Sequence, residues 1–184
     1  MRPMPRVSGR MRQTITMIGS AASARIETVS PTVAHQRSRG AEHPDQRREI
    51  EQDRSLLNRT VDETLRFEPT GPHVARWMAE DFECYGTTVP AGSAMLLLFG
   101  AANRDPRRYT NPDTFDIRRD NISHITFGKG VHYCLGASLA RLEGRVALDE
   151  IFNRWPEWDI DYDTAQLAST STVRGWERLR IVLP

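Results

Sequence analysis

A glycine-rich segment with a single cysteine, residues 127–136 with the sequence FGKGVHYCLG, is the most restrictive feature of this chain. Glycine lacks a Cβ, so the backbone at Gly128, Gly130 and Gly136 is free to take a positive φ or to approach a bulky group closely. Leucines at helical spacing follow the segment. The pattern predicts a loop that runs into a helix, with Cys134 at the start of that helix.

Cys134 is the side chain of this segment best suited to metal chemistry. A helix N-terminus presents free N–H groups and partial positive charge, which lower the pKa of a thiol and favour the thiolate. A thiolate is a strong ligand for iron. The ring of Phe127 would shield the sulfur from water, and such shielding tunes the redox potential of a bound metal.

Two other interpretations of Cys134 stay open from the residues alone. A lone cysteine near a helix start is commonly a small buried apolar side chain. A zinc ion would take His132 and Cys134, which stand two positions apart. Zinc sites normally combine C-x-x-C or H-x-x-x-H pairs, however, and Cys84 has no such partner.

Composition excludes several classes of protein. The chain carries 25 Lys and Arg against 24 Asp and Glu, a formal charge of +1, whereas a general nucleic-acid binder carries a basic excess. Two cysteines are too few for a disulfide-built secreted scaffold. The longest apolar run, residues 94–102, falls far short of the roughly 20 residues of a bilayer span. Because no secretory apolar core is present either, we expect a cytoplasmic protein without a membrane or nucleic-acid partner.

The first part of the chain divides into a start without periodicity and a series of helices. Residues 1–12 show no usable period and are expected to be disordered. Apolar spacings of three and four predict a helix from Ile15 to about Val33, interrupted at Pro31. A second helix is expected to start at residues 43–45, and a third, with an apolar stripe, to end before Pro69.

The second part changes from short strands to a long loop and a final helix. Residues from Trp77 to Gly92 suggest short strands joined by tight turns, and residues 94–99 a buried strand or the start of a short helix. Residues 103–120 form a long polar loop, which usually has a structural or functional reason. The helix after the glycine-rich segment should end at Trp155, and residues 170–183 read as a hairpin with Gly175 near its turn. The leucine and valine positions on one face of that helix are Leu135, Leu139, Leu142 and Val146.

The glycine-rich segment resembles, residue by residue, the F-G-x-G-x-H-x-C-x-G heme-ligand loop of the cytochromes P450. The resemblance implies that Cys134 is the axial thiolate ligand of the iron of heme b, donating electron density that favours cleavage of the O–O bond. It also implies that His132 hydrogen-bonds a heme propionate. The positions that contact the cofactor would then be Phe127, Gly128, Gly130, His132, Cys134 and Gly136.

Other segments agree with this family in order and spacing. Glu63 and Arg66 resemble its E-x-x-R helix motif, which implies a buried pair that anchors the loop after Asn103; a solvated ion pair worth less than about 1 kcal/mol is the simpler interpretation. In this family a third residue, an arginine or histidine from a P-x-R-F segment, normally joins this pair as the third arm of the anchor. Here Thr114 replaces that basic residue, so Arg118 or Arg119 would have to serve as the third arm.

The arginine that follows this motif has a counterpart in the family as well. Arg76 stands ten residues after Arg66, where the family places an arginine that pairs with a heme propionate. Charge-assisted bonds between arginine and carboxylate suit that task. A solvated surface arginine is the alternative.

A weaker match lies near the start of the chain. Residues 24–28 resemble the A-G-x-[D/E]-T oxygen-activation motif of the distal helix, with Glu27 and Thr28 as the acid and hydroxyl that relay protons to bound dioxygen. Arg25 replaces the glycine that makes room for oxygen. The motif is therefore expected to be degenerate.

The resemblance covers residues 43–184 well and residues 20–42 poorly, and residues 13–42 are expected to be a degenerate distal-helix-like segment. It implies a mostly α fold with small β-sheets, the C-terminal portion of the cytochrome P450 fold with its N-terminal half missing. The implied function is heme-thiolate monooxygenation of a small organic substrate, with electrons from a ferredoxin or a flavin reductase. The alternative is a non-catalytic fragment or pseudoenzyme that at most binds heme.

Overall fold

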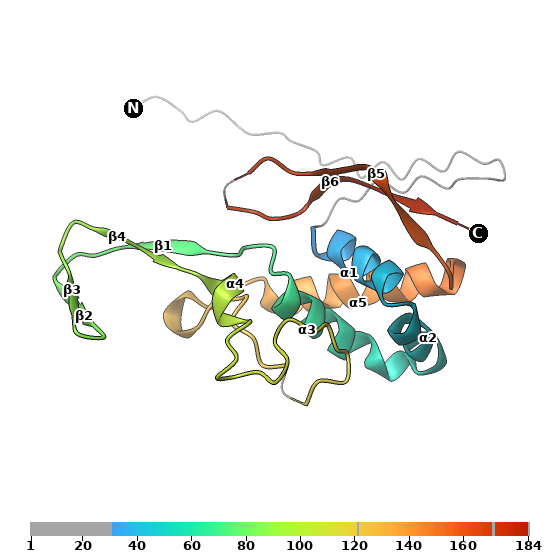
Figure 1. The fold of residues 1–184 in the computed structure, drawn as a ribbon, viewed down its shortest axis with the longest axis horizontal. Helices are drawn as coiled ribbons and strands as arrows, with labels where there is room; N and C mark the ends of the chain where they lie inside the picture. Colours follow the sequence, from blue (N-terminus) through green and yellow to red (C-terminus); the bar gives the residue numbers. More distant parts are fainter. Residues whose placement is uncertain (1–30, 121, 171, 184) are drawn as a thin grey trace, which may run out of the picture.

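The computed structural model of the chain describes residues 31–120, 122–170 and 172–183. Helices dominate, and the strands form three small sheets (Figure 1). The predicted fold class, mostly α with small β-sheets, is confirmed. The helical elements in chain order are α1 (Pro31–Glu42), α2 (Pro44–Gln52), η1 (Arg54–Leu56), α3 (Leu57–Phe67), α4 (Phe99–Ala102), η2 (Gly130–His132) and α5 (Ala137–Arg154).

Each sheet is an antiparallel pair of strands. The pairs are β1 (Val74–Trp77) with β4 (Ala94–Leu97), β2 (Phe82–Cys84) with β3 (Thr87–Val89), and β5 (Asp159–Leu167) with β6 (Trp176–Val182). Tyr85 and Gly86 both take positive φ in the tight turn between β2 and β3. The expected short strands after residue 77 are therefore confirmed.

One apolar core joins the helices to the hairpin of β5 and β6. In Figure 1 the hairpin lies along α1, and α1 in turn lies on α5 and α3. The stripe of α3, spaced at four residues, is buried, with Val61 and Leu65 each 1% exposed. The remaining core positions come from all these elements and include Ile50, Phe115, Ile117, Leu148, Phe152, Trp158, Leu179 and Ile181.

The ends of the early helices are set by prolines. α1 is described from Pro31 onward, and the residues before it lie outside the described part of the chain, so the interruption expected at Pro31 stays a prediction. The start of α2 at Pro44 and the end of α3 before Pro69 are confirmed. Residues 1–12 and most of the helix expected from residue 15 lie outside the described residues.

The C-terminal hairpin begins earlier than its sequence suggests. Residues 170–183 were expected to hold the whole hairpin, but its first strand is β5, which starts at Asp159. That strand escapes a pattern search because it is acidic and polar, with Ile160 its one buried residue. Residues 94–97 form a strand, as expected, but it is not buried, because alternate side chains are exposed.

The long helix α5 leaves apolar side chains on its outer face. It ends at Arg154, before Trp155-Pro156, as expected. Leu139, Leu142 and Val146 share a face of α5 and are exposed, whereas Leu148 and Ile151 are buried. In the part of the chain that the structure describes, the helices are all too short or too polar to cross a bilayer.

Candidate functional site

Residues 127–136, here called the cysteine loop, contain η2 and lead into α5. Backbone hydrogen bonds hold this loop at Cys134. The N–H of Cys134 donates to the carbonyl of Phe127 at 2.8 Å, and the carbonyl of Cys134 accepts from the N–H of Ala137 at 3.2 Å. Because Gly136 is the N-cap of α5, Cys134 precedes the first turn of the helix rather than lying in it. The thiol of Cys134 is free and exposed. The loop thus presents a single sulfur next to a helix N-terminus.

Two of the three predicted glycines are required by the backbone. Gly128 has φ 75° and Gly130 has φ 72°, values in the left-handed region that side-chain-bearing residues rarely adopt. Gly136 has φ −87°, so its conformation does not demand glycine. A Cβ there would lie 4.0 Å from the Cys134 sulfur. That distance is an ordinary van der Waals contact, so this structure leaves room for a side-chain carbon at position 136.

Several apolar side chains near Cys134 in the sequence are exposed. Val131 is 97% exposed and Leu135 is fully exposed, while Tyr133 and Leu139 are each at least half exposed. The Phe127 ring is half-buried and stands edge-on to Tyr133, with centroids 6.4 Å apart. The loop also meets α4, because a Cβ on Gly128 would lie 4.0 Å from Cζ of Phe99. This surface suits a large, flat and apolar partner.

Two predicted cofactor contacts, Arg76 and His132, are basic side chains that pair with no carboxylate among the described residues. Arg76 lies on β1, is half-buried, and donates to the carbonyl of Ala75 at 3.0 Å. His132 lies in η2 and is exposed. Among the described residues, neither side chain forms an ion pair with a carboxylate. Both are free to bind carboxylates supplied from outside the chain.

Glu63 and Arg66 form a buried pair on α3. Their side chains are fully buried, and two bonds of 2.7 and 2.8 Å join the guanidinium to the carboxylate. Arg66 also donates to the carbonyls of Asn103, Pro112 and Thr114 at 2.8–3.1 Å. The pair therefore fixes the long loop of residues 103–120.

The missing third arm is supplied by Arg119. Its Nε lies 3.2 Å from Glu63 Oε1, and its other nitrogens donate to the carbonyls of Thr110, Asn111 and Thr114. Arg118 points elsewhere and pairs with Glu49 at the surface. Of the two arginines that the sequence left as candidates, Arg119 is the one joined to Glu63.

Asn103 connects this network to the cysteine loop, a role that sequence reasoning missed. Its carbonyl accepts from Arg66, its amide donates to Thr126 Oγ1 at 2.9 Å, and its amide oxygen accepts from the N–H of Ile125 at 2.9 Å. The Thr126 hydroxyl donates to the carbonyl of Leu65 at 2.6 Å. Asn103 begins the run Asn103-Arg104-Asp105-Pro106, whose residues by themselves do not predict these contacts.

The zinc interpretation of Cys134 lacks further ligands. Within residues 31–120, 122–170 and 172–183, three or more His, Cys, Asp or Glu side chains gather nowhere as a metal-binding group. His132 and Cys134 would therefore need ligands from elsewhere. The other predicted site residues, Glu27 and Thr28, lie outside the described residues.

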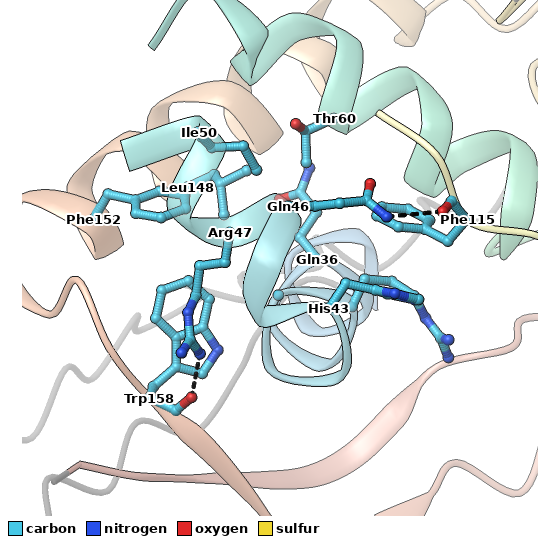
Figure 2. Close-up of a pocket in the computed structure, with 12 residues that line it drawn as sticks. Gln36, His43, Gln46, Arg47, Ile50, Thr60, Phe115, Leu148, Phe152 and Trp158 are labelled. Carbon is cyan, nitrogen blue, oxygen red and sulfur yellow. Dashed lines mark hydrogen bonds between the residues drawn. The ribbon is translucent and has the colours of Figure 1, made fainter. Parts of the chain in front are cut away.

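A small cavity in the helical core is separate from the cysteine loop. Figure 2 shows it between α1, α2, α3 and α5, beside Phe115 and Trp158, with Arg47 donating to the Trp158 carbonyl and Gln46 donating to that of Phe115. Its volume is about 10 Å³, too small for an organic substrate. None of the predicted site residues lines it. We assign it to core packing.

The helical body, the three small sheets and the cysteine loop before α5 form a mostly α fold with small β-sheets. A sequence profile of the family Cytochrome P450 matches residues 36–172. The chain belongs to the cytochrome P450 family.

Similar proteins agree on this assignment. Putative cytochrome P450 123 of Mycobacterium tuberculosis is 39% identical over 156 residues, 84% of this chain and 39% of the relative. Vitamin D(3) 25-hydroxylase of Pseudonocardia autotrophica is 42% identical over 144 residues, 77% of this chain and 36% of the relative. The ligand-free P450 monooxygenase TamI superposes with a TM-score of 0.79 at 37% identity, over 86% of this chain and 39% of TamI. The chain thus spans about two fifths of the length of the proteins it matches.

Proposed function

We propose that residues 43–184 are the heme-binding portion of a cytochrome P450 monooxygenase and that Cys134 is the axial ligand of heme b. The observation that carries this proposal is the free, exposed Cys134 sulfur, whose backbone N–H donates to the Phe127 carbonyl and which follows two glycines of positive φ. Proteins named as hydroxylases and monooxygenases are among the similar sequences and structures.

The residues around Cys134 fit heme in three respects. A single sulfur is available as a soft donor, as iron in this type of site requires. The exposed side chains of Val131 and Leu135 offer apolar surface, which gains by burial against a porphyrin ring. Arg76 and His132 supply cationic or hydrogen-bonding groups for two carboxylates.

When bound, the heme would supply the activation of dioxygen and the insertion of one oxygen atom into a small organic substrate. Cys134 would hold the iron through its sulfur, two residues before the N-cap of α5. Phe127 would limit the access of water to that sulfur. We propose Glu27 and Thr28 as the proton-delivering pair, and a ferredoxin or a flavin reductase as the electron donor.

A heme titration with spectroscopy tests the ligand. The purified chain is titrated with hemin, reduced and exposed to carbon monoxide, and the difference spectrum is recorded. We expect a Soret band typical of thiolate-ligated heme in the wild type and in Cys84→Ala, and its loss in Cys134→Ala. Failure to take up heme, or a thiolate band that persists in Cys134→Ala, would overturn the proposal for this chain.

Turnover separates a monooxygenase from a chain that only binds heme. With a ferredoxin, its reductase and a set of organic substrates, the proposal predicts product that contains one atom from labelled dioxygen. A stable thiolate spectrum without any such product would instead support the alternative of a heme-binding pseudoenzyme.

A further inference from the structure

Asp62 on α3 accepts hydrogen bonds from two segments that enclose the cysteine loop. Its Oδ1 lies 2.7 Å from Nε of Arg141, on α5, and 3.2 Å from Nε2 of His124, which precedes the loop. The sequence separations are 79 and 62 residues. Asp62 therefore joins the entry and the exit of the segment that carries Cys134.

Besides Asp62, Arg141 contacts two residues of the cysteine loop, Phe127 and Tyr133. Its guanidinium carbon lies 4.8 Å above the centroid of the Phe127 ring, within the range of a cation–π contact. Its Nη1 donates to the Tyr133 hydroxyl at 3.3 Å. Phe127 provides the carbonyl that accepts the Cys134 N–H, and Tyr133 precedes Cys134. Arg141 thus contacts both residues that determine where the sulfur lies.

His124 supports the same loop from its entry side. Its Nδ1 accepts from the N–H of Thr126 at 3.2 Å, so a neutral ring carries its proton on Nε2, which then donates to Asp62. The ring is 2% exposed, and its centroid lies 5.7 Å from that of Phe127. The Asp62 carboxylate therefore holds the buried imidazole in one orientation against Phe127.

The charge of Asp62 suits this position. Burial alone raises the pKa of Asp62, but hydrogen bonds and charge from His124 and Arg141 outweigh burial and lower that pKa below its usual value. The carboxylate is therefore ionised at neutral pH and acts only as an acceptor. Glu63, its neighbour in sequence, instead serves the loop of residues 103–120.

We propose that Asp62 is a positioning residue for the Cys134 ligand, acting through Arg141 and His124 on Phe127 and Tyr133. The role of the sulfur as a ligand rests on the proposed function, but the positioning of the loop does not. The Asp62 contacts differ in place from those of Glu63. The partners of Asp62 contact Phe127 and Tyr133 beside Cys134, whereas those of Glu63 lie in the loop of residues 103–120.

Amide hydrogen exchange of the chain without heme tests the positioning by itself. Asp62→Asn keeps the shape of the side chain but replaces an acceptor oxygen by a donor amide, whereas Asp62→Glu keeps the charge. We expect exchange in residues 124–137 to accelerate about tenfold in Asp62→Asn and less in Asp62→Glu, with the β5–β6 hairpin unchanged. Asp149→Asn is the matched control, because Asp149 on α5 pairs with Arg54 away from the loop.

A second variant and a spectrum complete the test. Arg141→Lys keeps a positive charge for Asp62 but loses the planar group that lies over Phe127, so it should accelerate exchange in the same segment even if Asp62→Asn does not fold. With heme, Asp62→Asn and Arg141→Lys should each lose part of the thiolate band in favour of a thiol-ligated form. Asp62→Glu, which keeps the carboxylate, should keep more of the thiolate band than Asp62→Asn does.

The outcomes distinguish this inference from the proposed function. Unchanged exchange in residues 124–137, or equal acceleration of the hairpin, would overturn the positioning role of Asp62. If the wild type takes up no heme, the proposed function fails for this chain, while the exchange data still decide whether Asp62 positions the loop.

Discussion

Arg119 donates from Nε to Oε1 of Glu63 across 3.2 Å, although 56 residues separate the two in sequence. The same carboxylate binds Arg66, so two arginines share one buried acid. Thr114, which stands where the family has a basic residue, contributes its carbonyl to both arginines. The anchor of the long loop is therefore complete, with its third arm moved five residues along the chain.

Arg119→Ala should destabilise the fold strongly. Glu63 is fully buried, so removing Arg119 leaves part of its charge uncompensated and also removes the donor from the carbonyls of Thr110 and Asn111, while the Thr114 carbonyl keeps Arg66. We expect a loss of about 3 kcal/mol in the free energy of unfolding, measured by urea titration. Arg118→Ala is the matched control: its pair with Glu49 is exposed and should cost less than about 1 kcal/mol. Equal effects of the two substitutions would refute the buried anchor.

Gly144→Ala should also destabilise the chain, although alanine favours helices. A Cβ at Gly144 would lie 2.9 Å from Nε2 of Gln36 and 3.3 Å from Cγ1 of Val61, both in the packed core. Overpacking costs roughly 1–3 kcal/mol, against a gain in helix propensity of up to about 1 kcal/mol. We expect a net loss of about 1 kcal/mol in urea unfolding, whereas Glu143→Ala on the exposed face should change little. A stabilised Gly144→Ala protein would contradict the close contact between α1 and α5.

The stability of the chain should fall in acid because of Glu68. Burial alone raises the pKa of this carboxyl, but His35, Arg39 and Arg174 lie within 3.3 Å and lower it from 4.5 to about 2. A depressed acid stabilises the fold above its unfolded pKa, and that stability is lost as the pH falls from about 4.5 to about 2.

A comparison with Glu68→Gln measures this contribution. The wild type should exceed the variant in unfolding free energy by up to about 3 kcal/mol at pH 7, and the difference should shrink toward pH 2. A difference that stays constant with pH would show that the charge of Glu68 is not what joins α1, α3 and the segment at Arg174.

Heme should protect Cys134 from alkylation and should not change the alkylation rate of Cys84. In the heme-free chain, iodoacetamide should label the exposed Cys134 faster than the half-buried Cys84. A sulfur bonded to iron is no longer a free nucleophile, so heme should slow labelling of Cys134 at least about tenfold. Peptide mass spectrometry gives both rates in one sample. Equal protection of the two cysteines would point to a general change in exposure instead of ligation.

The sequence predicted those features of the fold that depend on residues close together in the chain. The spacing of Leu57, Val61 and Leu65 predicted α3, because one stripe of a helix must be buried. The glycines at 128 and 130 predicted a left-handed loop. The polar strand β5 gave no such signal, since its pairing with β6 depends on residues that follow it in the chain.

Long-range contacts account for most of what the sequence did not reveal at the site. The choice of Arg119 over Arg118 follows from the path of residues 103–120, which no period encodes. Asp62 reads as an ordinary polar helix residue until folding brings His124 and Arg141 to it. The exposure of Leu139 and Leu142 likewise contradicts the simple rule that an apolar helix face is buried.

X-ray absorption at the iron edge of the heme-loaded chain tests the Cys134 ligand most directly. The account predicts one sulfur atom bonded to the iron in the wild type and in Cys84→Ala, and no sulfur in Cys134→Ala. Iron bonded only to nitrogen and oxygen in the wild type, or a sulfur bond that survives in Cys134→Ala, would contradict it.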